Sequence, residues 1–326
     1  MSAILSFDKE TEQLIRNRIS FTSNRLNIEE KQIYNLFPHF FNESIKISVS
    51  QRVARYIDHT LLKPDATKKQ LEQICNEAKE NNFYAVCVNS NPAVVGFPLG
   101  AMDANCKIFE TERAVENGAN EIDMVINIGR LKDGEYLEVL SDIHGIVQAI
   151  DPKIKLKVIL ETCLLTKELI VDACLLSVIA GASFVKTSTG FSTGGAKDEH
   201  VKLMKLVVGN LAEVKASGGI RTYQDSIKML LNGATRIGAS SSVAIVNGEL
   251  EAINKVGSLV QDSSKSKNQT KESKDSFEPP IPINNEKLAL WGTLITAAIS
   301  GFFIGMKKQK NSTTNTMTRS QRNKRK

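Results

Sequence analysis

The sequence predicts an α/β protein whose main domain, residues 52–260, is a parallel (β/α)8 TIM barrel. From about residue 52 to 250, short β-branched runs alternate with amphipathic helical runs, which is the pattern of repeated βα units. Eight of these runs are strand candidates. Three helices end in Asn-Gly-Ala or Ala-Gly-Ala, at 117–119, 180–182 and 232–234, and each leads into the next strand. Glycine caps at a recurring position indicate repeated units.

One connection in the predicted barrel is too short to contain a helix. The strand candidates are residues 55–59, 84–88, 93–98, 121–126, 155–160, 183–186, 212–215 and 235–238. Four residues, 89–92, separate the second candidate from the third. A crossover between neighbouring parallel strands needs about a dozen residues or more, usually a helix. We therefore expect a barrel that lacks its second helix, with seven helices for eight strands.

The segments on either side of the barrel have a different composition. Residues 1–51 mix charges and aromatics and predict a helical extension of unassigned role, and their early acidic residues argue against a signal or transit peptide. Residues 261–287 are polar and end in prolines, which predicts a disordered linker. The five cysteines have no paired or metal-like spacing, as is typical of reduced thiols in the cytoplasm.

Residues 288–306 predict a single transmembrane helix. They form a stretch of 19 residues without a charge, and at about 1.5 Å per residue such a helix can just cross a bilayer core. A buried core helix is the alternative, but the linker before the stretch and the basic tail at 307–326 leave no core to join. We expect a tail anchor in an intracellular membrane with the barrel in the cytoplasm, although the positive-inside rule alone favours the opposite orientation.

The excess of basic residues in the chain is confined to the carboxyl-terminal segment 307–326. The net charge is +6, and residues 307–326 hold eight Lys and Arg and no acid. The rest of the chain is therefore not basic, and we predict no nucleic-acid partner.

Two lysines end consecutive strand candidates, and each is followed by small residues. Lys186 precedes Thr-Ser-Thr-Gly, and Lys215 precedes Ala-Ser-Gly-Gly. Both fall at the carboxyl ends of strands, where barrel enzymes place catalysis. A lysine beside another cation loses proton affinity, and its neutral amine can attack a carbonyl. Backbone N–H groups and hydroxyls after the lysines suit a phosphate. The pattern predicts a Schiff-base enzyme for a phosphorylated sugar, without deciding which lysine forms the imine.

Asp123 is an acid inside an apolar strand candidate. Alternation places Glu121, Asp123 and Val125 on one face. A carboxylate inside a barrel needs a partner, because an unpaired buried charge is costly. A lysine would serve, and the pair could relay protons; a purely structural ion pair is the alternative. Asp58 is a weaker candidate of the same kind, and His59 beside it is expected to be a packed or solvent-facing residue.

Glycines and serines follow the last two strand candidates, where such barrels commonly bind phosphate. They are Gly218 and Gly219 after the seventh, and Ser240 and Ser241 after the eighth. The serines could equally cap the last helix, and the two roles are compatible. Cys87 is expected to be a small core residue. Metal-ligand spacing, a Rossmann fingerprint and a P-loop are absent from the sequence, so we predict no metal and no cofactor.

Eight motifs together resemble those of deoxyribose-phosphate aldolase, in order over about residues 52–248. They lie at 57–64, 86–89, 95–100, 109–112, 122–127, 185–191 (VKTSTGF), 214–221 (VKASGGIR) and 236–241 (RIGASS). The resemblance implies a (β/α)8 barrel and a carbon–carbon lyase of the class I aldolase type. Such an enzyme reversibly cleaves 2-deoxy-D-ribose 5-phosphate to D-glyceraldehyde 3-phosphate and acetaldehyde without a metal.

The resemblance also implies roles for single residues. Lys186 matches the imine-forming lysine, Lys215 matches the lysine that lowers its neighbour's pKa and takes part in proton transfer, and Asp123 matches the proton-relay aspartate. Further residues fall on motifs that contact the substrate or its phosphate: Asp58, Thr189, Gly190, Gly218, Gly219, Ser240 and Ser241.

The chain departs from the family pattern at two places. The family has a helix between the motifs at 86–89 and 95–100, and it lacks the segment at 288–306. A rival hypothesis is therefore a membrane-tethered pseudoenzyme, a binding platform with a damaged barrel. A different lyase or isomerase on the same barrel is a further alternative. The sequence leaves the oligomeric state open, a homo-oligomer included.

Overall fold

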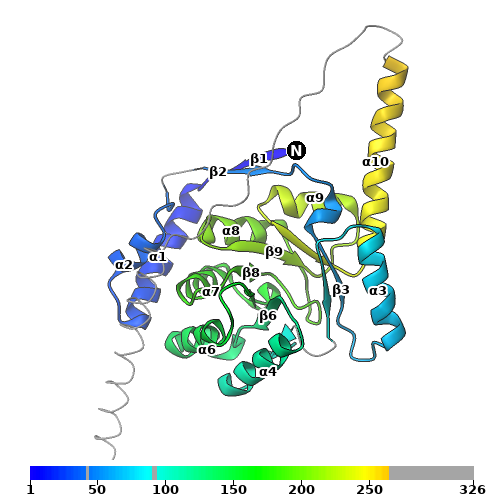
Figure 1. Cartoon of the computed structure of the whole chain (residues 1–326). Coiled ribbons are helices and arrows are strands. Elements are labelled where there is room, and N and C mark those ends of the chain that lie inside the picture. Colours follow the sequence, from blue (N-terminus) through cyan, green and yellow to red (C-terminus); the bar gives the residue numbers. More distant parts are fainter. Residues whose placement is uncertain (42–43, 90–93, 264–326) are drawn as a thin grey trace, which may run out of the picture.

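The computed structural model describes residues 1–41, 44–89 and 94–263, and its centre is a sheet of eight parallel strands (Figure 1). The strands pair in the order β4-β3-β10-β9-β8-β7-β6-β5. The prediction of eight parallel strands is confirmed, and every strand overlaps its predicted range. In chain order they are β3 (Ile57–Leu61), β4 (Ala85–Val88), β5 (Val94–Val95), β6 (Glu121–Val125), β7 (Lys155–Ile159), β8 (Phe184–Lys186), β9 (Glu213–Ser217) and β10 (Arg236–Ala239).

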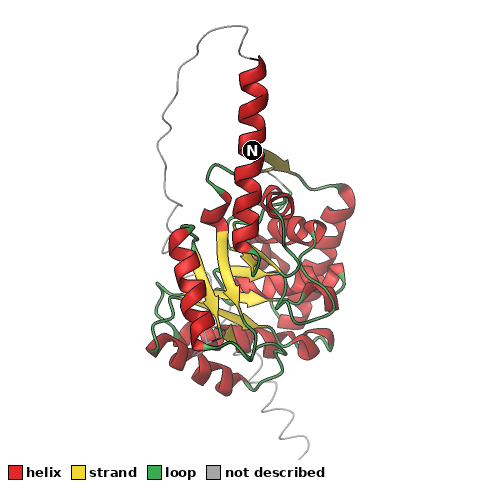
Figure 2. Ribbon diagram, turned by 90° about the vertical axis from the view of Figure 1, so that its right-hand side faces the viewer, coloured by secondary structure: helices red, strands yellow, loops and turns green. Residues whose placement is uncertain are grey.

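Helices cover the outside of this sheet (Figures 1 and 2). Seven long helices follow β3 in the described part of the chain, as predicted, together with the short α5 (Ile128–Lys132). Several begin at a side-chain cap that the sequence supplies; Thr67 and Thr222, for example, each form a capping box. The long helices are α3 (Lys68–Glu80), α4 (Ala104–Glu116), α6 (Tyr136–Ala149), α7 (Lys167–Ile179), α8 (Asp198–Val208), α9 (Tyr223–Leu231) and α10 (Ser242–Ser263).

The barrel is nearly closed, with its opening between β4 and β5. These two strands are the ends of the sheet order, and no pairing between them is found in the described residues. Side chains bridge the opening instead. Leu62, Cys87 and Val94 form a small buried cluster, and Phe97 packs against it. The described residues contain no helix between β4 and β5, and residues 90–93 lie outside them.

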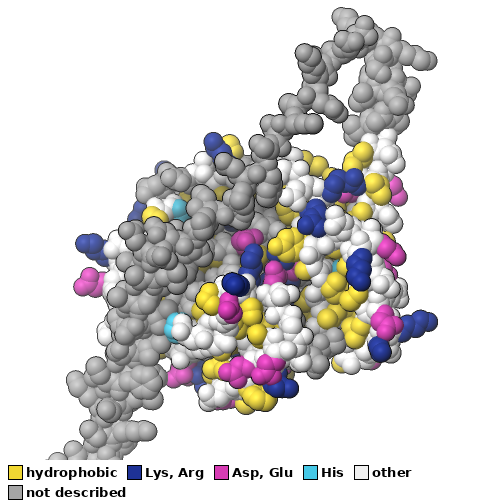
Figure 3. Space-filling view, viewed as in Figure 1, with side chains coloured by type: hydrophobic (Ala, Val, Ile, Leu, Met, Phe, Trp, Pro, Cys, Tyr) yellow, Lys and Arg dark blue, Asp and Glu magenta, His cyan; other side chains and the backbone are white. Residues whose placement is uncertain are grey.

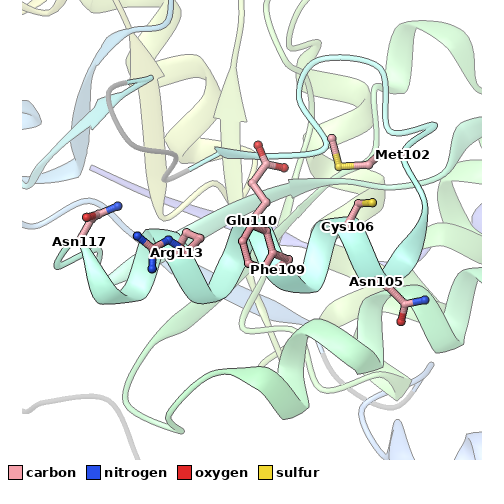
Figure 4. Close-up of a pocket in the computed structure, with 7 residues that line it drawn as sticks. All are labelled: Met102, Asn105, Cys106, Phe109, Glu110, Arg113 and Asn117. Atoms are coloured by element: carbon pink, nitrogen blue, oxygen red, sulfur yellow. The ribbon is translucent and has the colours of Figure 1, made fainter.

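A groove of about 720 Å³ runs along the outer side of α4, the helix that follows β5 (Figure 4). Met102, Cys106 and Phe109 form part of its lining, and the Phe109 side chain is 64% exposed. In a regular barrel the helix between β4 and β5 would pack beside α4. The exposure of Phe109 is therefore explained by the lack of a neighbouring helix on this side of α4 in the described residues.

The amino-terminal extension packs on the outside of the barrel wall. It consists of β1 (Ser2–Leu5), α1 (Lys9–Leu26), α2 (Glu30–Leu36) and β2 (Ile45–Ser48), and β1 and β2 form an antiparallel pair. The prediction for residues 1–51 named helix alone, so the two strands are additional. Helix α1 lies against α6 and α7 (Figure 1). Every residue from Ile170 to Ile179 of α7 is buried as a result, although one side of an outer barrel helix normally faces water.

A buried acid joins α1 to this wall. Asp172 of α7 accepts hydrogen bonds from Arg18 Nε at 2.8 Å, from Thr22 Oγ1 at 3.3 Å and from the Tyr136 hydroxyl. Burial raises the pKa of Asp172, and the Arg18 guanidinium opposes that rise. The carboxylate therefore needs Arg18 to remain ionised inside the protein.

Several predictions concern residues outside the described part. None of the helices in the described residues is long and apolar enough to cross a membrane. The transmembrane helix predicted at 288–306 and the basic tail at 307–326 lie outside the described residues, as does the linker from residue 264 on. Helix α10 ends at Ser263, just beyond the predicted barrel boundary at residue 260.

We predict that Arg18→Ala lowers the free energy of unfolding by about 3 kcal/mol, because it leaves the buried Asp172 carboxylate without its cation. Urea denaturation measures the change. Glu12→Ala is the matched control, since it breaks an exposed pair with Arg16 on the same helix and should change stability by under about 1 kcal/mol. Equal effects of the two substitutions would contradict the role of Arg18.

Candidate active site

Three of the predicted site residues meet inside the barrel. Lys186 ends β8, and Lys215 lies directly opposite it on the neighbouring strand β9. Asp123 comes from β6, two strands away from β8. Asp123 Oδ2 lies 2.8 Å from Lys186 Nζ and 3.0 Å from Lys215 Nζ. All three residues are at most 2% exposed, so the sequence prediction that a lysine partners this acid agrees with the geometry.

A third lysine holds the other oxygen of the same carboxylate. Lys157 of β7 is the register partner of Asp123, and its Nζ lies 2.8 Å from Asp123 Oδ1. Burial raises the pKa of the Asp123 carboxyl. The attraction of the three ammonium groups outweighs that effect, so its pKa lies well below the usual range. Asp123 is therefore an anion at neutral pH.

The charges continue around the barrel as a closed ring. Lys157 Nζ lies 2.6 Å from Glu121 Oε2, and Arg236 Nη1 lies 3.2 Å from the same oxygen. Arg236 Nη1 is also 2.8 Å from Asp58 Oδ1, and Asp58 Oδ2 is 2.6 Å from Lys215 Nζ. We call these seven residues the ion network: Asp58, Glu121, Asp123, Lys157, Lys186, Lys215 and Arg236.

The members of the ion network do not share the carboxylates equally. Lys157, Lys215 and Arg236 each contact two carboxylates. Lys186 contacts one, among the described residues, and shares that oxygen with Lys215. Lys186 is therefore the cation with the least anionic support.

The pKa of Lys215 is raised rather than lowered. Burial lowers it, but the attraction of Asp123 and Asp58 outweighs the burial. The same balance raises the pKa of Lys157, where Asp123 contributes most of the attraction. Lys215 therefore stays an ammonium at neutral pH. Lys186 is the last residue of β8, as predicted, whereas Lys215 is the third of the five residues of β9 and does not end its strand. Because Lys186 has fewer carboxylate partners than Lys215, the geometry favours Lys186 as the nucleophile.

Glycines lie in the two loops that follow the lysine-bearing strands. Gly190 follows β8, and Gly218 and Gly219 follow β9, all with φ between 78° and 87°, which glycine adopts without strain. A Cβ on Gly195 would lie 2.2 Å from the Gly218 carbonyl oxygen, so the two loops need glycine to approach this closely. Both loops leave neighbouring strands at the same end of the barrel, where a phosphate could meet their N–H groups.

The serines lie at the amino terminus of α10. Ser240 and Ser241 follow β10, and the Ser241 carbonyl accepts the bond from Ile245 N that begins the helix. A helix of this length presents unpaired N–H groups and a positive dipole end to an anion. The residues predicted to bind phosphate after β9 and after β10 thus follow two adjacent strands.

Thr189 differs from the other predicted phosphate residues. Its hydroxyl and its backbone N–H both donate to Glu161 Oε2, and the residue is 6% exposed. Its donors are therefore already satisfied within the protein. Glu161 has φ of 57°, which is unusual for a residue with a side chain and typical of strained functional positions. The sequence carried no signal for Glu161.

His59 and Cys87, for which the sequence predicts no catalytic role, occupy packed positions. His59 is buried, and its ring nitrogens contact Ser242 Oγ at 2.9 Å and Glu77 Oε2 at 2.7 Å. Cys87 is part of the cluster at the barrel opening, and burial raises the pKa of its thiol. Both agree with the expectation of packed residues.

The described surface carries charges of both signs. Lys and Arg side chains are interspersed with Asp and Glu side chains over the part of the molecule that is coloured in Figure 3. No group of His, Cys, Asp and Glu side chains able to hold a metal ion occurs in the ranges that the structure describes. The chemistry that the arrangement offers is that of a buried amine with a fixed carboxylate and a second ammonium beside it.

Known proteins match the barrel closely. Residues 52–250 match the DeoC/LacD family aldolase model. The deoxyribose-phosphate aldolase of Clostridium perfringens strain 13 is 52% identical over 216 residues, which cover 61% of this chain and 96% of that protein. The corresponding protein of Carboxydothermus hydrogenoformans is 54% identical over 220 residues, with the same coverage.

Solved structures agree with these sequence matches. A putative deoxyribose-phosphate aldolase from Coccidioides immitis superposes with a TM-score of 0.58 at 42% identity, covering 61% of this chain and 87% of that one. The deoxyribose phosphate aldolase of Aeropyrum pernix gives a TM-score of 0.56 at 28% identity, with 71% and 96% covered. The chain therefore belongs to the DeoC/LacD family of aldolases.

Proposed function

We propose that this protein is a deoxyribose-phosphate aldolase. It reversibly cleaves 2-deoxy-D-ribose 5-phosphate to D-glyceraldehyde 3-phosphate and acetaldehyde. One observation carries the proposal: Lys186 lies 2.8 Å from the buried Asp123 carboxylate, with Lys215 on the same oxygen. The arrangement belongs to a barrel that shares more than half its residues with relatives of that name.

The reaction begins with the amine of Lys186. The neutral amine attacks C1 of the open-chain sugar; the carbonyl oxygen takes up a proton and the nitrogen gives one up, through water, to give a carbinolamine. Lys215 is an ammonium beside this position and can donate that proton. A second proton converts the hydroxyl to water, which leaves, and a protonated imine remains on Lys186.

Carbon–carbon cleavage follows from the charge on the imine. The C2–C3 bond breaks, its electron pair moves into the imine to form an enamine, and the C3 hydroxyl loses its proton to become the aldehyde of glyceraldehyde 3-phosphate. The enamine then takes a proton at C2, and water hydrolyses the resulting imine to release acetaldehyde and restore the amine. Asp123 and Lys215 move these protons, through water where they do not reach the substrate directly.

The phosphate of the sugar binds at the adjacent loops of β9 and β10. Gly218, Gly219, Ser240 and Ser241 supply N–H groups and hydroxyls, and Gly190 adds an unobstructed backbone. Asp58 acts on Lys215 rather than on the sugar, because its oxygens are occupied by Lys215 and Arg236. Thr189 acts by fixing Glu161 at the edge of the site.

The rival function, a binding platform without activity, derives from the opening between β4 and β5. The ion network argues against it. A pseudoenzyme has no need of three lysines buried around one acid, which is costly to maintain without a function.

We also propose a membrane anchor at residues 288–306 and a homo-oligomeric state. The uncharged 19-residue stretch would anchor the protein to an intracellular membrane, with the barrel facing the cytoplasm. The Aeropyrum pernix relative is described as tetrameric, and we propose that this barrel also forms a homo-oligomer.

We expect sodium borohydride to trap deoxyribose 5-phosphate or its acetaldehyde fragment covalently on Lys186. Mass spectrometry of the digested protein locates the adduct. Lys186→Met should remain folded by circular dichroism and give no adduct. A folded wild-type protein without an adduct on Lys186 would refute the aldolase and favour the binding platform.

We expect Lys215→Met to lower kcat by about 10²-fold or more, because it removes a proton donor from the site. Steady-state cleavage of deoxyribose 5-phosphate measures kcat and KM. Lys205→Met is the matched control, since Lys205 is another buried lysine whose amine contacts the Gly209 carbonyl, outside the ion network. Comparable losses of kcat in both variants would mean that the effect is one of stability.

We expect the full chain to sediment with membranes and to resist extraction by carbonate, whereas a chain truncated after residue 263 remains in the supernatant. Fractionation of cells that express each form measures the distribution. Recovery of both forms in the supernatant would reject the anchor.

A further inference from the structure

Lys157 is a buried cation to which the reaction, as described so far, gives no role. It is 2% exposed and lies on β7, between the strands that carry Asp123 and Lys186. Its amine contacts Asp123 Oδ1 at 2.8 Å and Glu121 Oε2 at 2.6 Å. It thus holds the oxygen of Asp123 that faces away from the two lysines of the proposed chemistry.

We propose that Lys157 is a positioning residue that keeps Asp123 oriented and gives the ion network one positive charge in excess, so that Lys186 can release its proton. This inference rests on the proposed function for its meaning in the reaction. It concerns a lysine that neither the strand-end pattern nor the motif resemblance singled out.

The orientation follows from the two contacts of one carboxylate. An aspartate side chain can rotate about its last torsion and exchange its oxygens. Lys157 fixes Oδ1, and its own position is fixed by Glu121. Oδ2 then remains between Lys186 and Lys215 at distances of 2.8 and 3.0 Å. A charge-assisted hydrogen bond in a buried site is strong enough to hold such an orientation.

The charge excess follows from the composition of the ion network. Its four cations face three carboxylates, so the network becomes neutral when one cation loses a proton. Lys186 has the fewest carboxylate contacts, and its proton can pass to solvent or to the substrate. Without Lys157, three cations would face three carboxylates, and the network would be neutral with Lys186 still protonated.

The other charged members of the ion network and the Cys87 thiol enter this balance. Burial raises the pKa of the Cys87 thiol, so this group stays neutral and leaves the charge count unchanged. These groups are Asp58 on β3, Cys87 on β4, Asp123 and Glu121 on β6, Lys157 on β7, Lys215 on β9 and Arg236 on β10.

A substitution at Glu121 changes the net charge of the ion network in the direction opposite to a substitution at Lys157. Glu121→Gln removes an anion while it keeps the shape of the side chain, so it increases the positive excess. Lys157→Met removes a cation and abolishes the excess. A network that acts through charge responds to the two substitutions in opposite directions, whereas a purely structural network is weakened by both.

The experiment is competitive acetylation of Lys186 in the full-length protein as a function of pH, read by mass spectrometry. Both amines contact the same Asp123 carboxylate, and neighbouring unit charges in a protein interior interact strongly enough that Lys157→Met should raise the labelling midpoint of Lys186 by about one to two pH units. Lys157→Arg should leave the midpoint near that of the wild type. Glu121→Gln should lower the midpoint, by less, because Glu121 forms its ion pairs with Lys157 and Arg236 rather than with Lys186.

Lys155→Met is the matched control. Lys155 lies two positions before Lys157 on the same strand, is half exposed and is 3.9 Å from Glu213, outside the ion network. Its loss should leave the midpoint unchanged.

An unchanged midpoint in Lys157→Met, or shifts of the same sign in Lys157→Met and Glu121→Gln, would overturn the proposal. If Lys157→Met does not fold, Glu121→Gln decides: a lowered midpoint supports the charge balance, and an unchanged or raised one overturns it. Acetylation needs no sugar. A wild-type protein that forms no borohydride adduct but shows these shifts would therefore refute the aldolase and keep the ion network.

Discussion

The Asp123 carboxylate, shared by three lysines from three different strands, is the interaction on which the site depends. Burying several charges is favourable only when each is paired and hydrogen-bonded. Asp123 meets that requirement for Lys157, Lys186 and Lys215 together. The parallel register of the sheet makes this possible, because it places residues of neighbouring strands at the same height. The fold therefore provides the charges with their partners before any substrate arrives.

The ion network and the opening of the barrel lie on different strands. The network draws its residues from β3 and from β6 to β10, which are continuously paired. The opening lies between β4 and β5, which contribute none of the seven residues. A shortened connection between those two strands thus leaves the pairing that orients Lys186 in place. This separation is why a barrel with no helix between β4 and β5 among its described residues can retain the complete arrangement of charges.

The eight strands and the positions of Lys186 and Lys215 could be predicted from the sequence. Short apolar runs mark the strands, and a charged residue within or directly after such a run marks a candidate for the barrel interior. Lys157 was missed although the alternation that selected Asp123 applies equally to Lys155-Leu-Lys157-Val; its significance depends on which strand lies beside which. Glu161 was missed because a positive φ on a glutamate leaves no mark in composition. The place of the amino-terminal extension also required the fold: the apolar run at 170–179 shows that this side of α7 is covered, but only the structure shows that α1 covers it.

The edges of β4 and β5 give the molecule a property that a closed barrel does not have. A closed barrel has no free strand edges, and separating two of its strands breaks a ladder of hydrogen bonds. In the described residues, contacts between side chains alone join these two edges, through Leu62, Cys87, Val94 and Phe97. Separating the two edges therefore costs apolar contacts rather than a ladder of hydrogen bonds, and we expect β4 and β5 to open locally more readily than the paired strands. The expected line of local opening lies on strands that carry none of the ion network.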